Sequence, residues 1–133
     1  MPGYSGTPLP KKLGIKDGFR VALVDSPQEV VKDLKPHLDK CEVADGKSPL
    51  DFAIVFTKSK AALAKEFKRI AKQLAPAGML WVSWPKKSSG VATDLDENVV
   101  RGIGLAAGLV DVKVCAITDV WSGLKFVRRL KDR

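Results

Sequence analysis

Three short apolar runs, each followed by a helical pattern, constrain the fold of this 133-residue chain more than any other feature. The runs are RVALVD at residues 20–25, DFAIVF at 51–56 and MLWVSW at 79–84. Runs that are apolar at nearly every position are typical of parallel strands buried on both faces. Strands that alternate with helices predict one α/β domain built on a mostly parallel sheet.

Start and stop signals delimit the helix that is predicted after the first run. Residues 26–29 (SPQE) have the pattern of a capping box, in which Ser26 caps the helix and Pro27 takes the first helical position. Pro36 is expected to end or kink the helix early. The helix would bury a stripe formed by Val30, Leu34 and Leu38.

Two further helices are predicted after the second and third runs. Residues 60–74 repeat apolar positions at helical spacing, and Pro76 and Gly78 are expected to stop this helix. Thr93 is expected to cap a helix that extends to about Gly108. The predicted inward positions of that helix are Leu95, Val99, Ile103 and Ala106. Close approach of its backbone to the sheet is the expected use of Gly102, Gly104 and Gly108.

The two ends of the chain follow different patterns. Residues 112–117 and 124–130 are strand-like but are separated only by residues 118–123, which implies an antiparallel hairpin. A short strand near residues 41–44 is also compatible with the sequence. Residues 1–18 are rich in Gly and Pro and predict an N-terminal arm, which lies on a single domain formed by residues 19–133.

Composition narrows the class of protein without choosing one function. The formal net charge of +8 favours acidic partners, such as an anionic small molecule, an acidic protein surface or nucleic acid. Cys41 and Cys115 lie outside any Cys or His cluster, so we expect plain thiols and no metal site. No apolar run approaches the roughly 18 residues that span a bilayer, and no signal-peptide pattern is present. We therefore expect a soluble cytoplasmic protein with no membrane partner.

Three motifs carry a resemblance to a known family. They are GYSGTPLPKKLGIK at residues 3–16, WPKKSSG at 84–90 and WSGLKFVRR at 121–129. Together they resemble a bacterial family that is described only as a domain of unknown function, and the match extends over nearly the whole chain. The resemblance implies no activity and assigns no site residues.

The order of predicted elements is also similar to the second half of the class I methyltransferase fold. This distant likeness implies a Rossmann-like, shortened methyltransferase-type sheet with a C-terminal antiparallel hairpin. Such enzymes bind S-adenosylmethionine with a glycine-rich turn after the first strand, whereas residues 26–29 contain no glycine and Pro27 removes a backbone donor. Only residues 26–50 separate the first two strong strands, which leaves no room for a full cofactor-binding half. Glu42 or Asp45 could hold a ribose, but we expect no tight binding of S-adenosylmethionine.

Physical rules place a ligand site at one edge of the predicted sheet. Ligands of open α/β sheets bind beyond the carboxyl ends of the strands, where helix N-termini present free N–H groups. The loops that reach this edge supply an anion-binding set of Lys58, Ser59, Lys86, Lys87, Ser88, Ser89 and Gly90. Trp84, with Tyr4 if the arm folds back, would form a flat wall for a ring. In the alternative interpretation, the lysines are solvated and Trp84 belongs to the core.

Three functions are compatible with these patterns. The first is a non-enzymatic or vestigial Rossmann-like module that binds an anionic small molecule or an acidic partner at this edge, with no catalytic residue, cofactor or metal. The second is an S-adenosylmethionine-dependent methyltransferase-like enzyme. The third is a nucleic-acid-binding protein that uses the basic face of residues 60–72 and the basic tail, although these lack the interleaved aromatic residues of base-stacking domains. The sequence favours the first.

Overall fold

Side chains that alternate along two central strands divide the core into two layers. The computed structural model describes residues 8–44 and 49–133. Strands β3 (Leu50–Phe56) and β4 (Leu74–Pro85) are buried on both faces, as their apolar sequences require. One hydrophobic cluster takes from them Phe52, Ile54, Phe56 and Trp81. The cluster on the opposite face takes Ala53, Val55, Leu80 and Val82.

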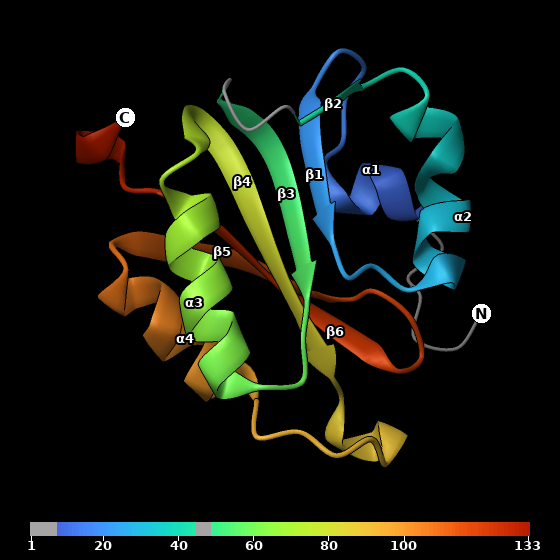
Figure 1. The fold of residues 1–133 in the computed structure, drawn as a ribbon, viewed down its shortest axis with the longest axis vertical. Helices are drawn as coiled ribbons and strands as arrows, with labels where there is room; N and C mark the ends of the chain where they lie inside the picture. The colour runs from blue at the N-terminus through green and yellow to red at the C-terminus, as the bar shows by residue number, and fades with distance from the viewer. Residues whose placement is uncertain (1–7, 45–48) are drawn as a thin grey trace.

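Six strands of the described residues form one sheet in the order β2-β1-β3-β4-β6-β5. Strands β1 (Arg20–Val24), β3 and β4 are parallel neighbours, and the two-residue β2 (Glu42–Val43) pairs with the start of β1 (Figure 1). Strand β6 (Trp121–Arg128) is antiparallel to both β4 and β5 (Leu109–Ala116). These pairings confirm the predicted parallel strands, the short strand and the antiparallel hairpin.

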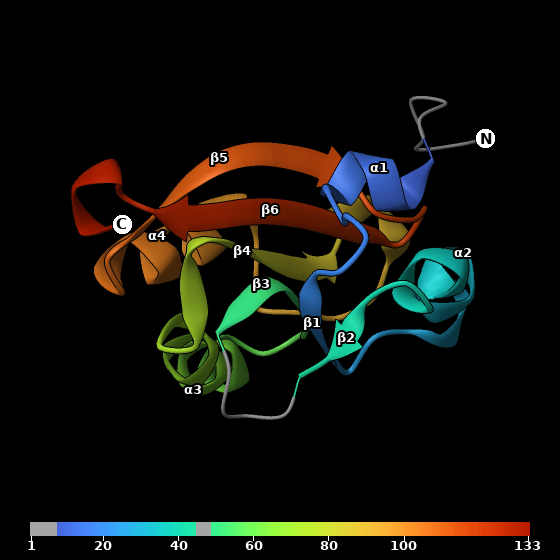
Figure 2. The same cartoon turned by 90° about the horizontal axis from the view of Figure 1, so that it is seen from above.

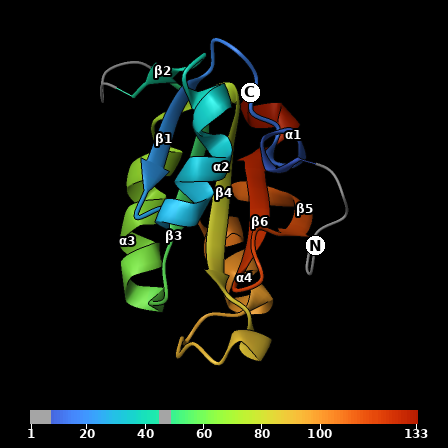
Figure 3. The same cartoon turned by 90° about the vertical axis from the view of Figure 1, so that its right-hand side faces the viewer.

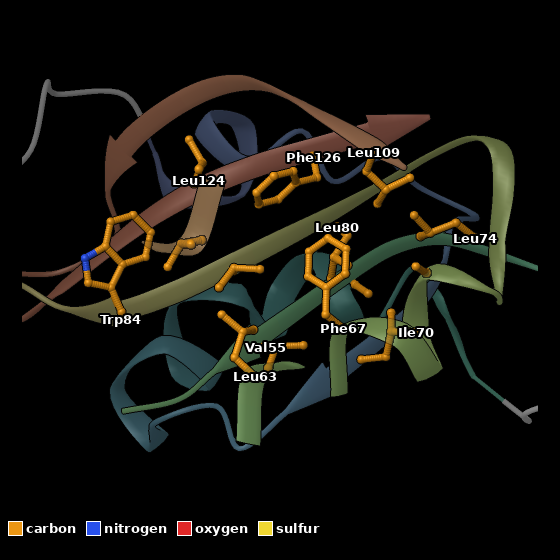
Figure 4. Packing of buried hydrophobic residues seen from close by; sticks show 14 of the residues in the cluster. Val55, Leu63, Phe67, Ile70, Leu74, Leu80, Trp84, Leu109, Leu124 and Phe126 are labelled. Atoms are coloured by element: carbon orange, nitrogen blue, oxygen red, sulfur yellow. The ribbon is translucent and has the colours of Figure 1, made fainter. Parts of the chain in front are cut away.

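Helices cover both faces of the sheet. Helices α1 (Leu9–Leu13) and α2 (Gln28–Leu38) pack on the face that contains Trp81. Helices α3 (Lys60–Ala71) and α4 (Glu97–Ala106) pack on the opposite face. Figures 2 and 3 show α1 and α3 on opposite sides of the central strands. In the layer drawn in Figure 4, the rings of Phe67 and Phe126 meet edge to face with their centroids 5.2 Å apart. Within the described ranges, no helix has the length and apolar character needed to cross a membrane.

A short helix in the predicted N-terminal arm contributes to the core. Leu9 and Leu13 of α1 are buried, and the Nε1 of Trp81 donates a hydrogen bond to the carbonyl oxygen of Leu13 at 2.9 Å. A buried indole N–H without a partner would destabilise the core, so this bond satisfies Trp81 and fixes α1 to β4. Tyr4 lies outside the described residues, as does the rest of segment 1–7.

The predicted capping box at the start of α2 is wrong. Asp25 has a φ of 55°, in the left-handed region, and Pro27 takes the N-cap position that was expected for Ser26. As a result, Ser26 does not reach the first turn and no side chain caps the helix. Pro36 lacks the N–H that would bond within the helix, and α2 nevertheless continues past it to Leu38.

Strand β4 begins earlier than predicted, at Leu74, and α3 ends at Ala71. Pro76 and Gly78 therefore lie within the strand, where they were expected to stop the helix. The register between β3 and β4 shifts just after Leu50, and a Cβ at position 78 would collide with the Leu50 carbonyl oxygen. Glycine at this position permits the irregular pairing through which the strand continues.

The predicted cap of α4 is also wrong. The Oδ1 of Asp96 accepts a hydrogen bond from the N–H of Val99 at 2.8 Å, so Asp96 caps the helix in place of Thr93. The buried stripe also differs from the predicted one, since Val100 and Gly104 are buried while the expected Ala106 is exposed. Among the other predicted inward positions, Leu95 is buried but precedes the helix. Val99 and Ile103 lie on the helix and are half-buried.

One of the three α4 glycines makes the predicted close approach to the sheet. A Cβ at Gly104 would collide with the ring of Phe126, whereas a Cβ at Gly102 would meet nothing within 4 Å. Gly108 follows the helix with a φ of 90°, a conformation that favours glycine. A Cβ at this position would meet nothing within 4 Å, so the reason for glycine here is its backbone conformation and not a close approach.

This contrast predicts opposite effects of alanine at two positions of one helix. Gly104→Ala is expected to lower the free energy of unfolding by about 1–3 kcal/mol, because the Phe126 ring must move within a packed core. The control Gly102→Ala is expected to raise it by up to about 1 kcal/mol, because alanine is the better helix former in open space. Urea unfolding of both variants measures the difference, and equal effects would contradict the close approach.

Candidate functional site

The strand order creates a topological switch point between β1 and β3. The chain crosses from β1 to β2 on one side and from β3 to β4 on the other. In open α/β sheets, ligands bind in the crevice at such a point, beyond the carboxyl ends of the strands. Figure 1 shows β1, β3 and β4 ending on the same side of the molecule. We call this side the carboxyl edge; it comprises residues 25–29, 57–60 and 86–96.

The start of α2, at the switch point, carries polar groups without protein partners. The Oγ of Ser26 is buried and accepts or donates no hydrogen bond within the described chain. No side chain caps the helix, and no acceptor in residues 8–44 or 49–133 bonds the backbone N–H of Gln28 or Glu29. The positive end of the helix dipole adds to these donors. Such a helix start can hold an anionic group.

The start of α3, by contrast, is already occupied by the protein's own acceptors. The Oγ of Ser59 accepts a hydrogen bond from Ala62 N at 3.2 Å, and the Oδ1 of Asp94 accepts one from Lys60 N at 2.7 Å. Thr93 reinforces this junction, because its Oγ1 donates to the carbonyl oxygen of Lys58 at 2.7 Å. The Asp94 carboxylate therefore fills the position at which an external anion would meet α3. Sequence reasoning missed this contact, since its two residues are 34 positions apart.

The loop after β4 is folded on itself. It forms a short 3₁₀ helix, η1 (Lys87–Ser89), and ends at Gly90, whose φ is 77°. The Oγ of Ser89 donates to the Lys86 carbonyl oxygen at 2.6 Å and accepts from Val91 N at 3.2 Å, while Lys86 N donates to the Val120 carbonyl oxygen at 2.8 Å. Ser88 remains exposed, with no hydrogen bond to the described part of the protein.

The structure brings the predicted lysines to the carboxyl edge but gives Trp84 a different environment. Lys58 and Lys87 are exposed, Lys86 is half-buried, and none of the three forms an ion pair with a described residue. Trp84 is only 5% exposed and packs within the α3–α4 cluster (Figure 4). Its indole thus presents little surface on which a ligand ring could stack.

The acids that were considered for ribose binding are not part of this edge. Glu42 forms an ion pair with Arg20 at 2.9 Å, beside the amino end of β1. Asp45 lies outside the described residues. The only carboxylate directly after β1 is that of Asp25, which is exposed on the left-handed turn. A ligand at the switch point would therefore meet Asp25 rather than Glu42.

The two cysteines have no features of catalytic nucleophiles. Both are free and half-buried. Burial raises the pKa of the Cys41 thiol, and it also raises that of Cys115 in spite of the charges of Lys12 and Lys113. Thiols with raised pKa values stay protonated at neutral pH and are poor nucleophiles.

Several solved structures with a similar fold are methyltransferases. The magnesium protoporphyrin IX methyltransferase (ChlM) from Synechocystis PCC 6803 with bound SAH superposes with a TM-score of 0.55 at 14% identity, covering 85% of this chain and 75% of that one. A putative methyltransferase from Thermoplasma acidophilum gives 0.57 at 9% identity, covering 92% and 75%. A putative type 11 methyltransferase from Sulfolobus solfataricus gives 0.53 at 19% identity, covering 91% and 89%.

These comparisons establish the fold. The chain is an α/β protein with the Rossmann-like sheet of class I methyltransferases. The sheet is mostly parallel, and its C-terminal strands form an antiparallel pair. No family model and no curated protein sequence matches it. The resemblance to a bacterial family of unknown function therefore stays a prediction.

The contact between Asp94 and α3 yields a prediction about stability. Asp94→Ala removes the acceptor of Lys60 N and should lower the free energy of unfolding by about 0.5–2 kcal/mol, the usual effect of losing a helix cap. Asp33→Ala serves as the control, because Asp33 is exposed in the middle of α2 and pairs with no described residue. Thermal unfolding of the two variants compares them. A loss no larger than that of Asp33→Ala would show that the contact contributes nothing.

Proposed function

We propose that this chain is a binding module that holds an anionic small molecule at the carboxyl edge and transfers no chemical group. The observation that carries the proposal is the start of α2. It lies at the topological switch point, has no side-chain cap, and adjoins a buried hydroxyl, that of Ser26, without a partner. The starts of α3 and α4 are each satisfied by a carboxylate of the chain itself.

The proposed ligand is bound from two sides. The N–H groups of Gln28 and Glu29 and the hydroxyl of Ser26 would receive its anionic group at α2. Lys58 would reach it from the loop after β3, and Lys86 and Lys87 from the loop after β4. In the loop after β4, Ser88, Ser89 and Gly90 would complete the anion-binding set. Ser59 would contribute by shaping the start of α3. The same lysines would also suit an acidic protein surface.

The turn after β1 argues against methyl transfer by the usual binding mode. Gly-rich turns let a backbone approach a nucleotide closely, whereas this turn holds a left-handed Asp25 followed by Ser26 and Pro27. Pro27 has no N–H to donate. The turn therefore has fewer backbone donors and more side-chain bulk than a dinucleotide-binding loop.

An S-adenosylmethionine-dependent enzyme is the second candidate, and the fold comparisons favour it. Several structures of similar fold carry SAM or SAH, among them ChlM with bound SAM and LepI in complex with SAM. The methionine part of this cofactor bears a carboxylate, which the start of α2 could also receive. Binding of S-adenosylmethionine would require Asp25 to contact its ribose or amino group in place of a glycine turn.

A thermal-shift screen tests both candidates. A ligand that binds only the folded chain adds about 2.7 kcal/mol at 100 times its Kd, which raises Tm by roughly 10 °C for a domain of this size. Lys86→Ala with Lys87→Ala is expected to abolish the rise. The control Lys16→Ala with Lys40→Ala removes the same charge near the amino end of β1 and should preserve it.

The choice of probes separates the outcomes. Nucleotides, sugar phosphates and dicarboxylic acids test the anion-binding proposal, and calorimetry with S-adenosylmethionine tests the second candidate. A low-micromolar Kd for S-adenosylmethionine would replace the first proposal by the second. If no probe raises Tm, or if the Lys86/Lys87 variant retains the rise, the lysines are solvated charges and the proposed site is wrong.

A further inference from the structure

Two neighbouring hollows lie along α3 and α4, and together we call them the groove. One hollow of about 290 Å³ is lined by Ala64, Phe67, Lys68, Ile103, Ala106 and Ala107. A second hollow of about 420 Å³ shares Lys68 and Ala107 with the first. It opens near the end of β6, where Arg128 and Asp132 also line it. Figures 1 and 2 show α3 and α4 side by side on this face of the sheet.

The two parts of the groove differ in chemistry. Apart from Lys68, the first hollow is lined by apolar side chains, and its floor is Phe67, which is buried against Phe126. Small side chains, Ala64 and Ala106, leave the space between the helices open. The second hollow gathers the charged side chains of Lys68, Lys72, Arg128 and Asp132.

The cations of the second hollow are largely free to bind a ligand. Lys68 and Lys72 form no ion pair with any described residue, and neither does Asp132. Arg128 is held by its Nη2, which donates to the carbonyl oxygens of Ala71 at 2.9 Å and Leu74 at 2.7 Å. Its Nη1 and Nε have no acceptor in the described chain.

We propose that this groove binds a single-chain alkyl phosphate, with the phosphate among Lys68, Lys72 and Arg128 and the hydrocarbon chain between α3 and α4. Three cations against one carboxylate leave a charge of +2, which matches the charge of nearly −2 on a phosphate monoester at neutral pH. The Arg128 guanidinium presents its remaining N–H donors in a fixed plane suited to phosphate oxygens. The apolar hollow, which shares Lys68 and Ala107 with this charged end, receives the chain.

The charge of the groove exceeds what the helix ends require. The C-terminal end of α3 carries partial negative charge, and nearby cations stabilise it. Arg128 already bonds two carbonyl groups there, and Arg69 in the last turn of α3 pairs with Glu66 at 2.6 Å. Lys68 and Lys72 thus remain as cations beyond those that hold the helix end.

Calorimetry with inorganic, butyl and octyl phosphate, below the concentration at which octyl phosphate forms micelles, tests the proposal. Each methylene that enters an apolar site raises affinity by up to about fourfold. In the Lys86→Ala, Lys87→Ala variant, whose carboxyl edge lacks two of its proposed anion ligands, octyl phosphate should therefore bind one to one and at least tenfold more tightly than butyl phosphate. Equal affinity of the two, or several octyl phosphate molecules bound per chain, would overturn the proposal.

Matched variants identify the two parts of the groove. Lys68→Ala with Lys72→Ala should weaken octyl phosphate at least tenfold, while Lys60→Ala with Lys65→Ala, on the same helix but outside both hollows, should change it less than threefold. Ala106→Leu, at an exposed position, should fill the apolar hollow and abolish the preference for octyl over butyl phosphate.

Two results would assign the lysines a different role. If both double variants lose equal affinity, the whole basic face attracts anions without a defined site. If a single-stranded oligonucleotide displaces octyl phosphate and loses equal affinity in both double variants, the face binds nucleic acid instead. The Lys86/Lys87 variant is expected to bind octyl phosphate normally, so this experiment succeeds or fails independently of the carboxyl edge.

Discussion

Burial of β4 on both faces, with hydrogen bonding along both of its edges, is the constraint on which the rest of the structure depends. One edge pairs with β3 in parallel and the other with β6 in antiparallel. One face carries Trp81, whose indole fixes α1, and the other carries Leu80 and Val82, over which α3 and α4 pack. Every layer of the molecule is thus positioned from this single strand.

The loops of the carboxyl edge are held mainly by bonds to one another. Thr93 and Asp94 fasten the loop after β4 to the start of α3, and Lys86 N fastens it to Val120 in the turn between β5 and β6. Such mutual bonding orders the loops in the free protein, and ordered loops would reduce the entropy lost if the proposed ligand binds. The start of α2 differs, because within the described residues no side chain caps it and the Ser26 hydroxyl has no hydrogen-bond partner.

The length of the apolar runs and the connections between them predicted the strands, their directions and the hairpin, because runs of this length bounded by turn signals fit strands, and strands joined through a helix run parallel. Sequence reasoning failed at two helix starts: Pro27 takes the N-cap position of α2, so that no side chain caps that helix, and Asp96, three residues after Thr93, caps α4. It also failed at Pro76, which an irregular stretch of strand accommodates. At the site, the lysines were predictable from loop positions. The hydrogen bond from Lys60 N to Asp94 and the one from Arg128 to the carbonyl oxygen of Ala71 could not be predicted, because each joins residues distant in sequence.

The position of β6 has a consequence for the way the sheet is assembled. Every other strand of the sheet precedes β6 in the chain, yet β6 lies between β4 and β5. During synthesis, the N–H and C=O groups along one edge of β4 therefore stay unpaired, and β5 has no strand beside it, until β6 has left the ribosome. Contacts of such long sequence separation slow folding and prolong the exposure of unpaired strands. Lys113, exposed on the edge strand β5, would then oppose wrong pairing between nascent chains, since edge strands that carry lysine resist aggregation.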